Sequence, residues 1–231
     1  MGAWQRGSGT PDDVLSSLGE DLHHVVIGLD PERPLGPAEA LGVLRRSGGP
    51  CAVALTAPGD PAGLAGPVAF NALVMEAGEA VLFPAAGLGL VPVQVGGAVE
   101  WRATAAHTPP ILDPREARQH LHMVLREVTE ELADLHIATW NNEIPDLLLN
   151  RADPPPIPRD IPATEARTLT TAALCCAIVD AAASVEPGAV TAWERSRLEA
   201  CMHRLDRAAR HALVALCSAD YAVTSDSLGS P

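Results

Sequence analysis

The hydrophobic pattern of this chain changes its period near the middle of the sequence. Between residues 23 and 103, short apolar runs alternate with Gly- and Pro-rich breaks, which is typical of strands and tight connections. From residue 113 onward, apolar residues recur at steps of three and four, the period of a helix that packs on one face. The sequence therefore predicts an α+β protein, with a small mixed β-sheet and two or three helices followed by a C-terminal helical bundle.

The first half contains five apolar segments of strand length. The last two are joined by Gly96-Gly97, a good signal for a two-residue hairpin. Helix starts are marked by Thr10-Pro11-Asp12-Asp13, by Pro37 and by Pro67, and the helices should end near Gly19, Gly48 and Gly78. The expected strands are residues 24–29, 51–56, 79–83, 90–95 and 98–103.

The second half predicts three long helices, over 113–143, 163–185 and 189–218. The first and last of them carry heptad-like apolar seams, and the middle one is apolar all round, as a central bundle helix should be. Residues 153–162 read as a stiff Pro-rich connector. We expect a sheet region over 1–110, a bundle region over 111–218 and a flexible tail over 219–231, or one continuous domain.

The chain has no lysine, and its 16 basic residues are all arginine, against 29 carboxylates. This composition, typical of a GC-rich genome, excludes Schiff-base, P-loop and Ser–Lys chemistry. The formal net charge of −13 is spread over both halves. Because phosphate backbones and anionic lipids need clustered cations, nucleic acid and membrane surfaces are disfavoured as partners.

The sequence also predicts a soluble, cytoplasmic protein. The first ten residues lack the apolar segment of a signal peptide. The most apolar stretch, residues 172–185, is too short to span a bilayer and contains Asp180, so we expect a buried core helix. The five cysteines lie mostly in apolar segments without a C-x-x-C pair, which favours buried, reduced thiols.

The glycine-rich segment 59–66 lies between a strand and a helix, where phosphate-binding loops occur. Its spacing matches neither the dinucleotide fingerprint nor a P-loop, and Asp60 places a negative charge in it. A tight connection is the favoured interpretation, and no cofactor is predicted.

This segment also carries a family resemblance. Residues 59–67, Phe70-Asn71, 77–81 and 87–92 resemble a group of uncharacterised proteins from GC-rich actinobacteria, over residues 50–150 or so. The resemblance implies an intracellular protein of unknown role and assigns no catalytic residue.

Searches for catalytic and metal-binding patterns give no assignment. No histidine on a predicted helix stands three residues after a glutamate, so the Glu-x-x-His di-iron pattern of a helical bundle is absent. No His-Glu-x-x-His, Gly-x-Ser-x-Gly or Ser-x-x-Lys motif occurs. Glu116 and His120 share a helix face with Glu127 below them, but a solvated face is the favoured explanation over a metal site. We therefore predict no catalytic residue and no metal ligand.

The last helix carries a basic stripe. Arg197, Arg204 and His211 recur every seven residues, with Arg207 and Arg210 beside them, and all should face outward. Simple solvation explains such a face, and a docking surface for an acidic partner is the sharper hypothesis.

Two functions remain open at this level. The favoured one is a non-enzymatic protein-interaction or regulatory protein that acts through its helical bundle. The alternative is a hydrolase or small-molecule-binding enzyme with a cleft between sheet and bundle. Candidate cleft residues are Asp60, Asn71, His107, Trp140, Asn141, Asn142 and Glu143.

The charges of the two long helices suggest self-association. Glu127, Glu130 and Asp134 lie away from the first seam, and the arginine stripe lies away from the last one. If both seams pack inward, these faces cannot meet within one chain but can meet between two. We therefore expect a homodimer or another protein partner.

Overall fold

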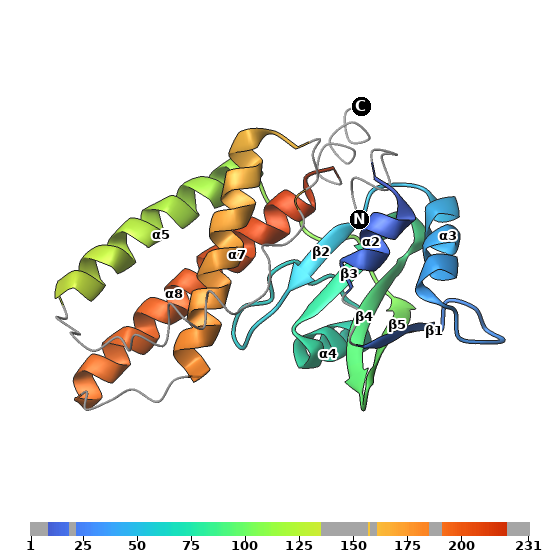
Figure 1. Cartoon of the computed structure of the whole chain (residues 1–231), viewed down its shortest axis with the longest axis horizontal. Helices are drawn as coiled ribbons and strands as arrows, with labels where there is room; N and C mark the ends of the chain where they lie inside the picture. The colour runs from blue at the N-terminus through green and yellow to red at the C-terminus, as the bar shows by residue number, and fades with distance from the viewer. Residues whose placement is uncertain (1–8, 19–21, 135–156, 158–160, 185–190, 221–231) are drawn as a thin grey trace. The chain divides into compact units, whose positions relative to one another are not determined.

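The computed structural model describes residues 9–18, 22–134, 157, 161–184 and 191–220 (Figure 1). The chain divides into two compact units. The first comprises residues 1–113, 158–160 and 214–231, and the second comprises residues 114–157 and 161–213. The expected tail, apart from residues 219 and 220, and most of the expected Pro-rich connector lie outside the described residues.

The first unit contains a five-stranded mixed sheet with the order β1-β5-β4-β3-β2. The edge strand β1 pairs parallel with β5, and the other neighbours are antiparallel. This sheet, together with the helices, confirms the α+β class. The strands are β1 (His23–Ile27), β2 (Ala52–Leu55), β3 (Glu79–Phe83), β4 (Leu88–Val95) and β5 (Ala98–Ala105).

The local signals of the sequence act as predicted. The hairpin between β4 and β5 turns at Gly96, whose φ of 59° favours glycine, and Val95 pairs with Ala98 across it. Thr10 caps the first described helix with a reciprocal capping box. Its hydroxyl accepts from the Asp13 N–H at 3.2 Å, and the Asp13 carboxylate accepts from the Thr10 N–H at 2.7 Å.

Three helices accompany the sheet: α2 (Pro11–Ser16), α3 (Pro37–Ser47) and α4 (Val68–Ala77), with a short 3₁₀ turn, η1 (Pro84–Ala86). Because successive side chains of a strand point to opposite faces of the sheet, the cores show which face α3 and α4 each cover. Leu82 of β3 packs in one core with Phe70 of α4, whereas its neighbour Phe83 packs in another core with Leu44 of α3. The sheet therefore lies between α4 on one face and α3 on the other.

The glycine-rich segment is a tight connection. Gly63 has a φ of 78°, and a Cβ at this position would lie 2.4 Å from the Val53 carbonyl oxygen. The loop backbone thus approaches β2 more closely than any side chain would permit. Close packing accounts for this glycine without a phosphate ligand.

The second unit consists of long helices: α5 (Pro114–Asp134), α7 (Ala163–Ser184) and α8, which runs over Ala192–Cys217 and ends in the first unit. The predicted seams supply its core. Leu121 and Val128 of α5 are buried with Met202 and Leu205 of α8, and Leu125 packs partly buried against them. Residues 135–143, the expected end of the first long helix, lie outside the described residues.

Helix α7 buries less of its surface than predicted. Thr168, Ala172, Cys175 and Ala181 are buried, but Leu174 is 51% exposed. Its core neighbours come from α5 and α8, so only one face of this all-round apolar helix is covered. Among the described residues, α7 alone is long and apolar enough to cross a membrane, with 22% of that stretch buried. Length and composition by themselves are weak evidence for a span.

The cysteines are all free thiols. Cys51, Cys175 and Cys201 are buried, which confirms the prediction for these three, and burial raises the pKa of Cys51 and Cys175 to about 11. Cys176 is half-buried, and burial raises its pKa to about 12. The prediction is wrong for Cys217, which is exposed because it lies at the end of α8.

Candidate functional site

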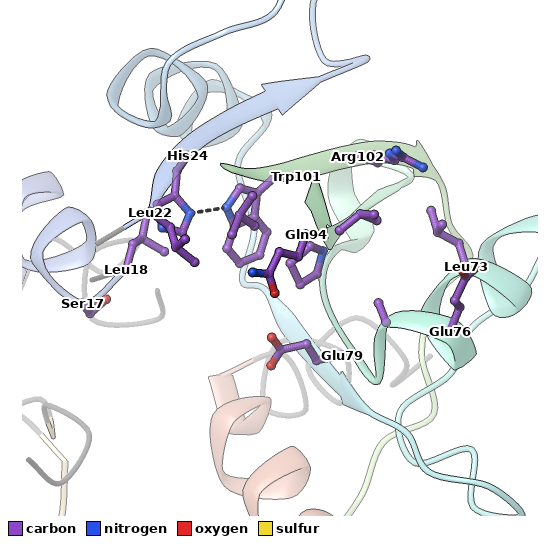
Figure 2. Close-up of a pocket in the computed structure, with 14 residues that line it drawn as sticks. Ser17, Leu18, Leu22, His24, Leu73, Glu76, Glu79, Gln94, Trp101 and Arg102 are labelled. Atoms are coloured by element: carbon purple, nitrogen blue, oxygen red, sulfur yellow. Dashed lines mark hydrogen bonds between the residues drawn. The ribbon is translucent and has the colours of Figure 1, made fainter. Parts of the chain in front are cut away.

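A hollow of about 670 Å³ opens in the first unit, and we call it the Trp101 hollow (Figure 2). Its wall is made by β1, β3, β4 and β5, by α4, and by residues around the end of α2. This volume falls within the range of small-molecule sites. Its lining is mixed, with slightly more apolar than polar surface, and its polar side chains include His24, Glu76, Glu79 and Gln94.

His24 and Trp101 form a hydrogen-bonded pair in the hollow. The Trp101 indole N–H donates to Nδ1 of His24 at 3.1 Å, and the two ring centroids lie 6.3 Å apart (Figure 2). The parallel pairing of β1 with β5 brings these two residues together, since Val26 is the register partner of Trp101 and His24 lies two residues before it. The side chains of His24 and Val26 therefore lie on one face of the sheet.

This hydrogen bond fixes what His24 can offer to a ligand. Because an indole N–H only donates, Nδ1 must accept, and the neutral imidazole carries its hydrogen on Nε2. The Nε2 atom is buried, and no described protein group bonds to it. A buried donor without a partner costs about 1–3 kcal/mol. A ligand in the hollow can accept from Nε2 and remove this cost once the side chains that cover the atom shift.

Glu79 opens strand β3 and extends toward the middle of the hollow (Figure 2). Glu79 is exposed, although desolvation by the surrounding wall raises the pKa of its carboxyl above the ordinary value. A carboxyl with a raised pKa in a hollow is a common feature of functional sites.

Replacing Glu79 with glutamine should stabilise the protein in a pH-dependent way. Because the folded pKa exceeds the unfolded one, the folded state is disfavoured as the pH rises through these values. The melting temperature of Glu79→Gln should therefore match that of the parent below pH ~4 and exceed it at pH 7. Calorimetry across this range checks the sign, and a lower melting temperature at pH 7 would contradict it.

None of the three predicted cleft residues that the structure describes lines this hollow. Asp60 is buried in the glycine-rich segment, where its backbone pairs with Ala57. Asn71 lies on α4 with a buried side-chain oxygen that has no partner among the described residues, and His107 is exposed after β5. Trp140, Asn141, Asn142 and Glu143 lie outside the described residues.

The arginine stripe of α8 is engaged within the chain. Glu131 of α5 pairs with Arg204 at 2.6 Å and with Arg197 at 3.4 Å, and the Arg204 hydrogen bond is the main cause that lowers the pKa of Glu131. Arg197 and Arg204 thus have a carboxylate partner within the chain, although Glu131 is not one of the three residues of the predicted acidic face, Glu127, Glu130 and Asp134. Glu131 lies close enough to the α5 seam to reach α8 in the same bundle.

The rest of the stripe is mixed in exposure. Arg207 is exposed, whereas His211 is half-buried. The Arg210 side chain is only 11% exposed and pairs with Asp206 at 2.8 Å. The Arg210 side chain is therefore largely covered, whereas the half-buried His211 is compatible with the predicted outward face.

Sequence reasoning missed the Trp101 hollow although one signal was present. His24 and Trp101 carry polar ring nitrogens although they stand in apolar strands. The alternation of side chains along a strand places both on the face of the sheet that α3 covers. Their meeting depends on a parallel pairing between segments more than seventy residues apart, which no local pattern encodes. In the part of the chain that the structure describes, no group of three or more His, Cys, Asp or Glu residues could hold a metal ion.

These observations define a two-unit α+β protein with a ligand-sized hollow in its sheet unit. Two family models match the chain. The Rv1486c-like protein N-terminal domain matches residues 1–117, and the Rv1486c-like protein C-terminal domain matches residues 115–214. The chain therefore belongs to the Rv1486c-like protein family, which confirms the actinobacterial resemblance. Comparisons with curated proteins and with solved structures return no match.

Proposed function

We propose that the first unit binds a small molecule in the Trp101 hollow. One observation carries this proposal: Nε2 of His24 is a buried hydrogen-bond donor whose position is fixed by Trp101 and which no described group satisfies. Native proteins leave few buried polar groups unpaired, and an unpaired one calls for an explanation such as a bound water, ion or ligand.

The composition of the wall supports this proposal. Ligand sites combine a mainly apolar surface with a few polar groups that fix orientation. Trp101 supplies a large aromatic surface, and Gln94 and Glu79 add an amide and a carboxyl on neighbouring strands.

The indole N–H of Trp101 provides a direct readout. In ¹⁵N-labelled protein its signal can be assigned with Trp101→Phe, and a mixed library of neutral, acidic and basic fragments can then be screened. We expect fragments that shift this signal to bind more weakly to His24→Phe and unchanged to His23→Phe, an exposed neighbour on the opposite side of β1. If no fragment shifts the Trp101 signal at millimolar concentration, the proposal fails.

A second function, association through the helical unit, is favoured by a different observation. Trp193 of α8 is 63% exposed and Leu174 of α7 is 51% exposed. Large exposed apolar side chains are common at protein interfaces, and tryptophan is enriched among residues that contribute most to binding. We propose that this unit forms a homodimer or binds another protein, in the cytoplasm and without nucleic acid.

Light scattering tests this association. A homodimer should give about twice the 24.1 kDa chain mass. Apolar contacts should drive it, so the mass should persist in high salt and fall to that of a monomer in Leu174→Glu or Trp193→Glu. A parent protein that stays monomeric at high concentration, in both low and high salt, would remove the homodimer.

A further inference from the structure

A second cavity adjoins the Trp101 hollow, and we call it the apolar chamber. It has a volume of about 240 Å³ and lies between α2, α3 and the sheet. The two cavities share three lining residues, Ser17, Leu18 and Trp101, so these residues separate two neighbouring spaces. A ligand held at His24 could therefore extend an apolar part past Trp101.

The chamber has the chemistry of a hydrocarbon site. Apart from Ser17, every residue that lines it is apolar. The chamber is partly open to the surface, and its volume exceeds the ~150 Å³ of an engineered apolar cavity that binds benzene. The main contacts would come from Leu15 of α2, Leu41 of α3 and Val81 of β3. An alkyl chain or a small ring system fits this space.

The polar groups of the Trp101 hollow determine which charge the polar head of such a ligand can carry. His24 offers a donor at Nε2, which a ligand must meet with an oxygen or another acceptor. Glu76 and Glu79 line the same hollow, and Arg102, on the wall, is already paired with Glu100 at 2.9 Å. The two carboxylates outnumber the single arginine on the wall, which is itself paired with Glu100, so the net charge of the hollow disfavours an anion. An ammonium group cannot accept from His24.

We infer that the ligand is a neutral amphiphile, whose polar head accepts a hydrogen bond from His24 in the Trp101 hollow and whose apolar tail occupies the adjoining chamber. This inference rests on the proposed function of the hollow. An amide or alcohol head meets the requirement, and an amide could also donate to the Glu79 carboxylate or the Gln94 side-chain oxygen.

Three probes with the same tail test the head group: octanamide, octanoate and octylammonium. Titration of each, followed by the Trp101 indole signal, should show octanamide binding at least about tenfold more tightly than octanoate, an order of magnitude that one unfavourable charge contact readily supplies. Butanamide and hexanamide test the tail, because each added methylene that enters the chamber should tighten binding about fourfold.

Matched variants distinguish the contribution of the ligand's head group to binding from that of its tail. His24→Phe should weaken octanamide about fivefold and leave octylammonium unchanged, and His23→Phe should change neither. Leu15→Trp fills the chamber and should weaken all three octyl probes by a similar factor. Val68→Trp, at a position 85% exposed on α4, controls for the added indole.

The outcomes distinguish this inference from the proposed function. If octanoate or octylammonium binds most tightly, or if chain length has no effect, the neutral amphiphile is wrong while ligand binding in the hollow stands. Equal weakening by His23→Phe and His24→Phe would likewise remove the His24 contact. If neither the fragments nor the octyl probes shift the Trp101 signal, both proposals fail together.

Discussion

Replacing Gly63 with alanine is expected to destabilise the first unit by about 3 kcal/mol or more. Two costs add at this position. The φ of 78° is strained for any residue with a side chain, and the new Cβ would lie 2.4 Å from the Val53 carbonyl oxygen and 2.8 Å from the Ala54 Cα. Both opposing atoms belong to the backbone of β2, so neither can move without disturbing the sheet.

Gly59→Ala is the matched control for this variant. Gly59 has the same φ of 78° and belongs to the same loop, but nothing lies within 4 Å of its Cβ position. It should therefore show the conformational cost alone, on the order of 1–2 kcal/mol. Unfolding free energies from urea titration give both values. Equal destabilisation by the two variants would mean that the loop relaxes and that close packing does not require Gly63.

Phe70→Ala should have the largest effect of any side-chain truncation in the sheet unit, about 3–5 kcal/mol. The ring is fully buried against the sheet, and it approaches β4 so closely that a Cβ at Gly89 would lie 2.5 Å from its Cε2 atom. Removing the ring would leave a cavity between α4 and the sheet that the rigid strand backbone cannot close.

Val68→Ala on the same helix is the control, since Val68 is 85% exposed and should change stability by no more than about 0.5 kcal/mol. Thermal denaturation and urea titration should separate the two variants clearly. A loss for Phe70→Ala close to that of Val68→Ala would contradict the assignment of Phe70 to the core.

Most helix and strand positions follow from the sequence because their signals are local. Thr10 and Asp13 stand three residues apart and satisfy each other's backbone N–H groups at a helix start. The Gly96-Gly97 pair needs only its two flanking strands to form a hairpin. The seam of α5 likewise predicts burial, because residues three and four apart share one face of a helix.

The same local patterns do not predict which side chains pair between two helices. The distance from Glu131 to Arg204 depends on how closely α5 and α8 pack, and the helical period does not specify that. For the same reason, the period of α7 could not show that only one of its apolar faces would be covered. Burial of an apolar helix depends on the number of its neighbours as well as on its composition.

The sequence by itself determined the α+β class, the elements and the chemistry that an acidic chain without lysine excludes, because composition and short-range patterns are properties of the chain alone. Only the tertiary structure decided the site. The parallel pairing of β1 with β5 joins His24 to Trp101 across more than seventy residues, and β3 and β4 add Glu79 and Gln94 to the same hollow. Such a convergence arises from the order of strands in a sheet, which hydrophobic periodicity leaves open.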